Sequence, residues 1–292
     1  MFYEVDIPQP RPGQRQLSVQ VVLTPAESRR LLAKATVALP EVQYAYKSGM
    51  IIIARGITSA FISEELFKIK VNPKACQTVG IICNGITNAN AEPPPCTWHV
   101  IKRGKVVENA DSNVEILNFG PNDVFIKGAN AIDYEGNAGV CSSSVKGGTI
   151  GMAWPIVMPR DSHLIMPVGL EKMVPSVMEA AKHSGIYRFK YTTGLPVKII
   201  PVPTGKVITE IQALAILAGV RAYALASGGV GGSEGAVVLA LEGDEERIIK
   251  AFELVKSIKG EPAITSPGKF YVSSAADYQY DALAQLATLK GL

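Results

Sequence analysis

The chain has 292 residues, a net charge of +3, and 47% hydrophobic against 19% charged residues. This composition can bury a substantial core and excludes a disordered chain, while the mild charge, without Lys and Arg runs among aromatic residues, excludes a nucleic-acid-binding protein. The apolar runs are shorter than a membrane span and no apolar signal core opens the chain, so we expect a cytoplasmic protein without membrane contact.

The sequence offers little for a metal ion or cofactor. Of its four cysteines and three histidines, only Cys96 and His99 stand at the spacing of metal ligands. A single C-x-x-H pair is a weak metal signal, and neither a P-loop nor a G-x-S-x-G motif is present. We therefore expect reduced thiols, no metal and no cofactor.

The chain opens with a strand and a capped helix. Residues 16–23 alternate as a strand does, and Thr24, Pro25 and Glu27 give the cap, first-turn proline and first-turn acid of a helix over 25–38.

A second strand–turn–helix unit follows. Residues 49–54 are continuously apolar, as in a buried parallel strand, and 60–69 indicate a helix. The turn between them could hold an anion at the helix N-terminus or be a plain turn capped by Thr58. Its candidate ligand-binding residues are Arg55, Gly56, Thr58 and Ser59.

The middle of the chain mixes short strands with polar turns. The expected elements are a strand and loop at 77–85, a Pro-rich loop at 88–98, a hairpin at 98–108 turning at Arg103–Gly104, a strand and polar turn at 122–140, a glycine-rich segment at 141–151, a strand at 154–159 and a helix at 171–185.

The C-terminal part suggests a β-α-β-β-α-β unit, which is ferredoxin-like. Its expected elements are strands at 195–203, 221–227, 236–243 and 261–266, helices at 205–219 and 244–260, and a glycine hairpin loop at 228–235. A last helix is expected over 277–292.

Four segments, in order, resemble a known superfamily. They are "GMIIIARGITSAFISEEL", "DVFIKGANAIDYEGN", "KGGT" and "GLPVKIIPVP". They are similar to motifs of ribose-5-phosphate isomerases, glucosamine-phosphate deaminases and family I CoA-transferases, and the resemblance covers roughly residues 45–262. It implies an α/β fold: a Rossmann-like, mainly parallel sheet domain over 1–194, with 263–292 returning to it, and a ferredoxin-like domain over 195–262. It also implies a homo-oligomer.

The chain differs from the isomerase pattern at the positions of the acidic residues in that family's motif. Lys127 and Asn130 stand where the isomerases have aspartates, and Asp133 alone matches the third acid. No acid follows Lys146 where the resemblance places a catalytic glutamate. An asparagine cannot accept a proton as a base, although its amide can hold an oxyanion or a hydroxyl.

The CoA-transferase branch would need a nucleophilic glutamate that forms an acyl anhydride. The candidates are Glu64, Glu65, Glu135 and Glu171, none of them in the "E-N-G" setting of that branch. Cys83 precedes an Asn–Gly pair, either as a reactive thiol or as a small strand-end residue.

We expect a cleft at the carboxyl ends of the strands. The catalytic candidates are Asp133, Asn130 and Lys146, and further ligand-binding candidates are Lys127, Gly128, Gly147, Gly148 and Thr149. Each charged candidate has a simpler alternative: a turn-closing Asx role for Asp133, a solvated loop for Lys146, and a surface ion pair for Arg55.

Three functions stay open on these grounds. The first is an enzyme for a small phosphorylated or carboxylated metabolite, like a sugar-phosphate isomerase but lacking its usual catalytic carboxylates. The second is a CoA-transferase or thioester-type enzyme, and the third is a non-catalytic metabolite-binding protein. The sequence names neither substrate, reaction nor oligomeric state.

Overall fold

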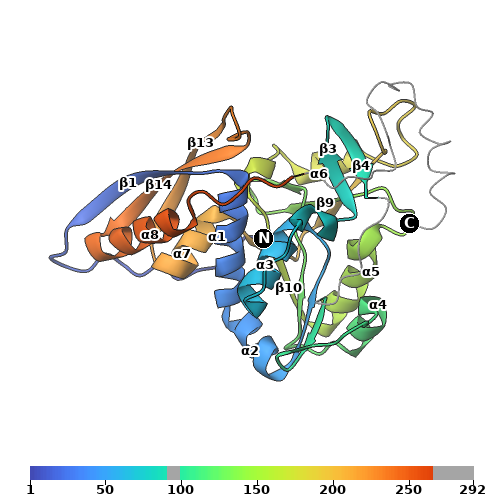
Figure 1. Cartoon of the computed structure of the whole chain (residues 1–292), viewed down its shortest axis with the longest axis horizontal. Coiled ribbons are helices and arrows are strands. Elements are labelled where there is room, and N and C mark those ends of the chain that lie inside the picture. The colour runs from blue at the N-terminus through green and yellow to red at the C-terminus, as the bar shows by residue number, and fades with distance from the viewer. Residues whose placement is uncertain (91–98, 266–292) are drawn as a thin grey trace.

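The structure is a computed structural model that describes residues 1–90 and 99–265 (Figure 1). Within these residues the fold is mixed α/β, with one six-stranded sheet, two three-stranded sheets and one hairpin. No helix in the described part of the chain is long and apolar enough to cross a membrane.

The six-stranded sheet, here called the large sheet, carries both parallel and antiparallel strands. In order across it lie β12 (Lys206–Ile208), β10 (His163–Pro167), β7 (Val124–Ile126), β2 (Met50–Ile53), β5 (Val100–Lys102) and β6 (Lys105–Val106). The first four are mutually parallel, and β5 and β6 close one side in antiparallel fashion.

Both faces of the large sheet are buried, because successive side chains of a strand point to opposite faces. Ile51 and Ile53 enter one core while Ile52 enters the other. The helices that supply the first core are α1 (Pro25–Ala38), α2 (Pro40–Ser48), α3 (Ile57–Phe67), α7 (Glu210–Ala218) and α8 (Glu245–Ile258). The second core is covered by α5 (Gly148–Val157), beside the short α4 (Ser112–Glu115).

A smaller antiparallel sheet, here called the small sheet, joins the two ends of the described chain. It consists of β1 (Gln16–Leu23), β14 (Ala236–Asp244) and β13 (Arg221–Gly228), with α7 and α8 (Glu245–Ile258) against it (Figure 1). Its buried residues belong to the first core, so α1 and α7 pack between the two sheets.

The remaining elements lie around the large sheet. They are a sheet of β11 (Lys198–Val202), β9 (Ala138–Ser142) and β8 (Ala131–Ile132), a hairpin of β3 (Gly80–Cys83) and β4 (Ile86–Ala89), α6 (Val177–Lys182), and 3₁₀ turns at Lys74–Gln77, Ile116–Asn118, Met158–Arg160 and Leu170–Lys172.

Several local predictions are confirmed. Thr24 and Glu27 form a reciprocal capping box at the start of α1. The β5–β6 hairpin turns at Arg103 and Gly104, both with positive φ, as a tight two-residue turn requires. The glycine loop after β13 is a hairpin loop, because β13 and β14 pair in antiparallel fashion.

Several element predictions are wrong. Residues 154–159 form no strand: they belong to α5 and its 3₁₀ end, because Ile150, Ala153 and Val157 pack as one helical face. Most of 171–185 is not helical, since α6 covers only Val177–Lys182. The helix expected from 205 begins at Glu210, because β12 is held in the large sheet by β10 and by the N-terminal residues.

The strand pairing expected within 195–262 also differs. β11 pairs with β9, and β12 pairs with β10, so only β13 and β14 of that unit share a sheet. Their third strand is β1, from the other end of the chain. Residues 261–265 are not a strand. The tail helix expected over 277–292 lies outside the described residues, as do residues 91–98 of the Pro-rich loop expected over 88–98 and residues 266–292 of the segment expected to return over 263–292.

Candidate functional site

The four parallel strands of the large sheet end at one edge. Their neighbouring backbone groups stay hydrogen-bonded there: Ala54 N–H donates to Ile126 O, Lys127 N–H to Ile165 O, and Val168 N–H to Ile208 O. Arg55 and Lys127 therefore follow neighbouring strands at one edge of the sheet, as the sequence predicts. The segments after β10 and β12 join them and bring residues that the sequence analysis did not place there.

Six side chains at this edge make up what we call the strand-end cluster. They are Arg29, Lys127, Cys141, Glu171, Lys172 and Glu210, linked to one another by ion pairing or electrostatic interaction.

The ammonium groups of the two lysines in the cluster contact the carbonyl oxygens of two consecutive residues. Lys172 Nζ donates to Ala129 O at 2.9 Å, and Lys127 Nζ approaches Gly128 O at 3.4 Å. Burial, together with the Lys172 cation, lowers the pKa of Lys127 to about 8. Burial also lowers the pKa of Lys172, while Glu171 and Glu210 oppose this effect.

Cys141 lies next to both lysines, and its thiol is half-buried and free. Burial raises the pKa of this thiol, although the Lys172 and Lys127 cations act in the opposite direction. Asn130 is exposed, and its side-chain Oδ1 accepts the Cys141 N–H at 3.0 Å. The amide oxygen thus joins the ends of β8 and β9, which leaves the Asn130 amide N–H groups for another partner.

The acids of the cluster form a buried pair. Burial, and next the Glu171 carboxylate, raise the pKa of Glu210 to about 7. Leu170 N–H donates to Glu210 Oε2 at 2.9 Å, and Arg29 pairs with Glu171 at 3.4 Å. Glu171 Oε2 and Glu210 Oε1 are buried and have no hydrogen-bond partner in the described residues.

Asp133 is a structural anchor. Its carboxylate accepts the backbone N–H of Glu135, Asn137 and Val177 and the side-chain amide of Asn137, at 2.9–3.1 Å. Burial would raise the pKa of Asp133, but these hydrogen bonds outweigh it and lower the pKa. These contacts are those of the turn-closing Asx role, and no contact of Asp133 in the described residues supports a catalytic role.

The turn after β2 offers one cation and a helix start. Gly56 precedes α3, and Thr58 and Ser59 are buried in the first turn without capping it through a side chain. Arg55 is half-buried and lies near His99; burial and the Arg55 cation lower the pKa of His99 to about 4.

The third predicted segment begins α5. Gly147 and Gly148 both have positive φ and stand at the helix start, with Thr149 exposed. Lys146 is exposed, and its backbone N–H donates to Ser144 Oγ at 3.2 Å. No contact places the Lys146 ammonium in the strand-end cluster within the described residues.

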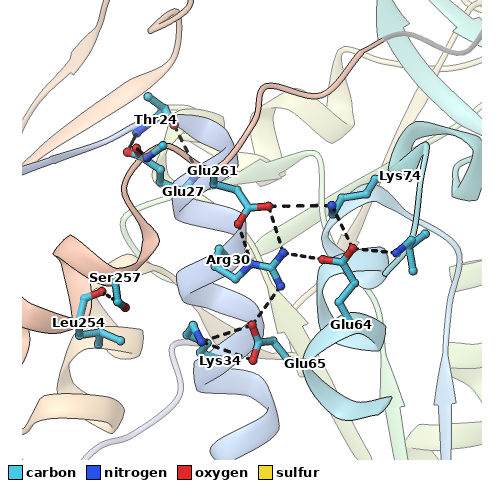
Figure 2. Close-up of polar contacts among 12 residues, drawn as sticks. Thr24, Glu27, Arg30, Lys34, Glu64, Glu65, Lys74, Leu254, Ser257 and Glu261 are labelled. Carbon is cyan, nitrogen blue, oxygen red and sulfur yellow. Dashed lines mark hydrogen bonds and ion pairs between the residues drawn. The ribbon is translucent and has the colours of Figure 1, made fainter. Parts of the chain in front are cut away.

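Of the four candidate glutamates, Glu171 alone belongs to the cluster. Glu64 and Glu65 are held by Arg30, in a network that also includes Lys74 and Glu261 (Figure 2). Glu135 is exposed and accepts the Asn137 amide at 3.2 Å. Cys83 ends β3 in the β3–β4 hairpin.

The sequence analysis missed Arg29, Cys141, Lys172 and Glu210. A signal for two of them existed: each follows a short apolar strand, "HLIMP" before "VGLEK" and "KVI" before "TE". Reading 205–219 as one helix hid Glu210, and Arg29 lies on α1 with no local pattern that would mark it.

No metal centre is apparent in residues 1–90 and 99–265, where no three His, Cys, Asp or Glu side chains are grouped to hold an ion. Cys96 lies outside these residues. Comparisons with protein-family models, with curated proteins and with solved structures found no match.

Proposed function

We propose that the protein is an enzyme that binds a small carboxylated or phosphorylated metabolite at the strand-end cluster. One observation carries the proposal: Lys127 and Lys172 both extend to this edge without a carboxylate within ion-pair distance in the described residues. A desolvated ammonium is costly unless an anion or strong acceptors compensate it. A bound carboxylate or phosphate would supply that compensation.

The perturbed pKa values of the strand-end cluster and its place in the sheet support catalysis in addition to binding. Groups with strongly perturbed pKa values gather at functional sites, and open α/β sheets bind ligands at the carboxyl ends of their strands. The Rossmann-like interpretation of the large sheet stays part of the proposal, supported by four parallel strands with helices on both faces.

The resemblance to the isomerases lacks a catalytic base, and we propose that the acid pair of Glu171 and Glu210 supplies it. A carboxyl group with a pKa near 7 can accept and return a proton at neutral pH. Glu171, at 11% side-chain exposure, is the member of the pair nearer to solvent, and Glu210 is fully buried. We assign proton transfer to Glu210, the acid whose pKa is raised, with Glu171 as its neighbour toward solvent.

A CoA-transferase or thioester-type enzyme is the second candidate. Its support is that Glu171 is the one candidate nucleophile at the strand ends, with Arg29 beside it. A metabolite-binding protein without catalysis would use the same lysines and would show binding without turnover.

A thermal-shift series tests the binding proposal, since a ligand stabilises the fold it binds by mass action. The probes are inorganic phosphate, ribose 5-phosphate, pyruvate and acetyl-CoA. We expect a shift with at least one probe that is lost in Lys127→Met and Lys172→Met and kept in the control Lys182→Met, on the exposed side of α6.

Each outcome has a consequence. A shift with acetyl-CoA alone that is lost in Glu171→Gln would favour the CoA-type candidate. A shift that survives in both cluster variants and is lost in Lys146→Met would move the site to the start of α5. No shift with any of the four probes would remove the support for this proposal.

The expected homo-oligomer stays a proposal as well. Among the described residues β13 is an edge strand of the small sheet, and its exposed Tyr223 and Leu225 would pair with a second copy. Light scattering after size exclusion tests it, and a monomer at all concentrations would contradict it.

A further inference from the structure

We propose that Lys127 is an amine nucleophile that forms an imine with the aldehyde or ketone group of the bound metabolite, beside Lys172 as a fixed cation. The inference rests on the proposed function and narrows its substrate class to carbonyl compounds that carry a carboxylate or a phosphate.

The geometry distinguishes the two lysines. Lys172 Nζ is fixed by a 2.9 Å hydrogen bond to Ala129 O, whereas within the described residues Lys127 Nζ has only the 3.4 Å approach to Gly128 O. A nucleophile needs an available lone pair, and a short hydrogen bond donated by an ammonium favours its protonated form. Lys127, whose contact is the longer of the two, therefore meets this condition better than Lys172.

The charges around the two lysines point the same way. Glu171 and Glu210 act on Lys172 and favour its charged form, while Arg29 and burial oppose it. Lys127 faces the Lys172 cation and the Cys141 thiol, and no carboxylate contributes to its titration. Burial beside a second cation is one of the ways in which a lysine amine becomes nucleophilic.

The lowered pKa of Lys127, about 8, makes this chemistry available near neutral pH. At pH 7 roughly one tenth of such an amine is neutral, against about one part in 2,500 for an ordinary lysine with a pKa of ~10.4. The gain in reactive amine is therefore on the order of two hundred-fold.

The position of Lys127 suits a covalent step. It follows β7, which lies between β2 and β10 in the large sheet, so its backbone is held on both sides. Lys127 as a whole residue is partly exposed although its amine is desolvated, and this exposure gives a small carbonyl compound access. Lys172 is placed to hold the carboxylate or phosphate of that compound.

The proposed step balances without an oxidant or reductant. The neutral Lys127 nitrogen attacks the carbonyl carbon, a C–N bond forms, and the carbonyl π electrons move to the oxygen, which takes up the proton that the nitrogen loses. The hydroxyl group of this carbinolamine then takes up a proton from solvent and leaves as water, and the nitrogen lone pair forms the C=N bond.

Reductive trapping tests the inference. The full chain is incubated separately with pyruvate, glyoxylate and dihydroxyacetone phosphate in the presence of cyanoborohydride, which reduces an imine to a stable amine. Peptide mapping by mass spectrometry then locates the adduct. We expect at least one probe to label Lys127 in preference to all other lysines, and much less label at Lys127 in Lys172→Met.

Lys127→Arg separates binding from chemistry, because it keeps the positive charge but cannot form this imine. Probe binding is followed by thermal shift in parallel. We expect Lys127→Arg to bind the probe and to lose the adduct, while Lys182→Met behaves as wild type. If Lys127→Arg does not fold, the peptide map of the wild-type chain decides alone.

The outcomes distinguish this inference from the proposed function. Binding without any adduct would overturn the inference and leave the proposed function standing. An adduct mainly on Lys172, or spread evenly over surface lysines, would also overturn it. Neither binding nor adduct with any of the three probes would count against both.

Discussion

Glu171 and Glu210 interact at the edge of the large sheet, and each buries one carboxylate oxygen that has no hydrogen-bond partner in the described residues. Two carboxylates at close range do not both ionise readily, and burial adds to the cost. Glu210 is therefore expected to retain its proton up to about neutral pH.

The acid pair predicts a specific dependence of stability on pH. Between the ordinary glutamate pKa and about 7, the native state holds a proton that the unfolded state has lost, so stability falls as pH rises through this window. In Glu210→Gln this fall should be largely absent, because the amide cannot ionise. We expect the variant to be more stable than wild type at pH 8, by on the order of 2 kcal/mol.

Urea unfolding of both proteins at several pH values measures this difference. Glu27→Gln is a control of opposite sign, because hydrogen bonds from Lys259, Thr24 and Gly260 hold the pKa of the buried Glu27 below its ordinary value despite burial. That variant should lose stability at neutral pH. Parallel pH profiles for wild type and Glu210→Gln would contradict the assignment.

The Arg30 network predicts a large loss of stability on truncation. Arg30 binds Glu64, Glu65 and Glu261 and joins α1, α3 and the segment after α8 (Figure 2). Removing the guanidinium leaves buried carboxylates short of a partner, although Lys74 and Lys34 compensate in part. We expect Arg30→Met to lower the free energy of unfolding by about 2–4 kcal/mol.

The matched control is Arg15→Met, which breaks an exposed ion pair with Glu245 at 3.8 Å. Its effect should stay within ~0.5 kcal/mol. Equal losses in the two variants, measured by urea unfolding, would show that the Arg30 network contributes no more than a surface pair.

Asp133→Ala should destabilise the fold through backbone groups that lose their acceptor. The N–H of Val177, which starts α6, is buried and would be unsatisfied. We expect a loss of about 2–4 kcal/mol, and a smaller loss in Asp133→Asn, which keeps one acceptor oxygen. Because the pKa of Asp133 is lowered, its contribution should disappear as pH falls below the unfolded value and through the native pKa. Unfolding curves at pH 7 and pH 3 test both points.

The amine of Lys127 should acylate with an unusual pH profile. Limited reaction with acetic anhydride, followed by peptide mapping, should give a rate midpoint near pH 8 for Lys127, against ~10.4 for an ordinary lysine. In Lys172→Met the midpoint should rise, because a neighbouring positive charge has been removed. A midpoint that is the same in the two proteins would contradict the electrostatic coupling of the lysines.

The sequence by itself determined the elements whose signals are local. The capping box at Thr24, the two-residue turn at Arg103–Gly104 and the glycine loop between β13 and β14 each depend on neighbours within a few residues. Propensity and turn chemistry act at that range, so these predictions are confirmed. Arg55 and Lys127 were also expected at one edge, because parallel strands end together.

Only the tertiary structure decided which strands pair and which side chains meet. β1 joins β14 from the far end of the chain, and β12 is a strand because β10 lies alongside it, although its sequence continues smoothly into α7. Lys172 reaches Ala129 O, close to Lys127, for the same reason: β7 and β10 are neighbours in the sheet. Pairing between distant segments is selected by burial of the whole core, and no local pattern in the sequence records it.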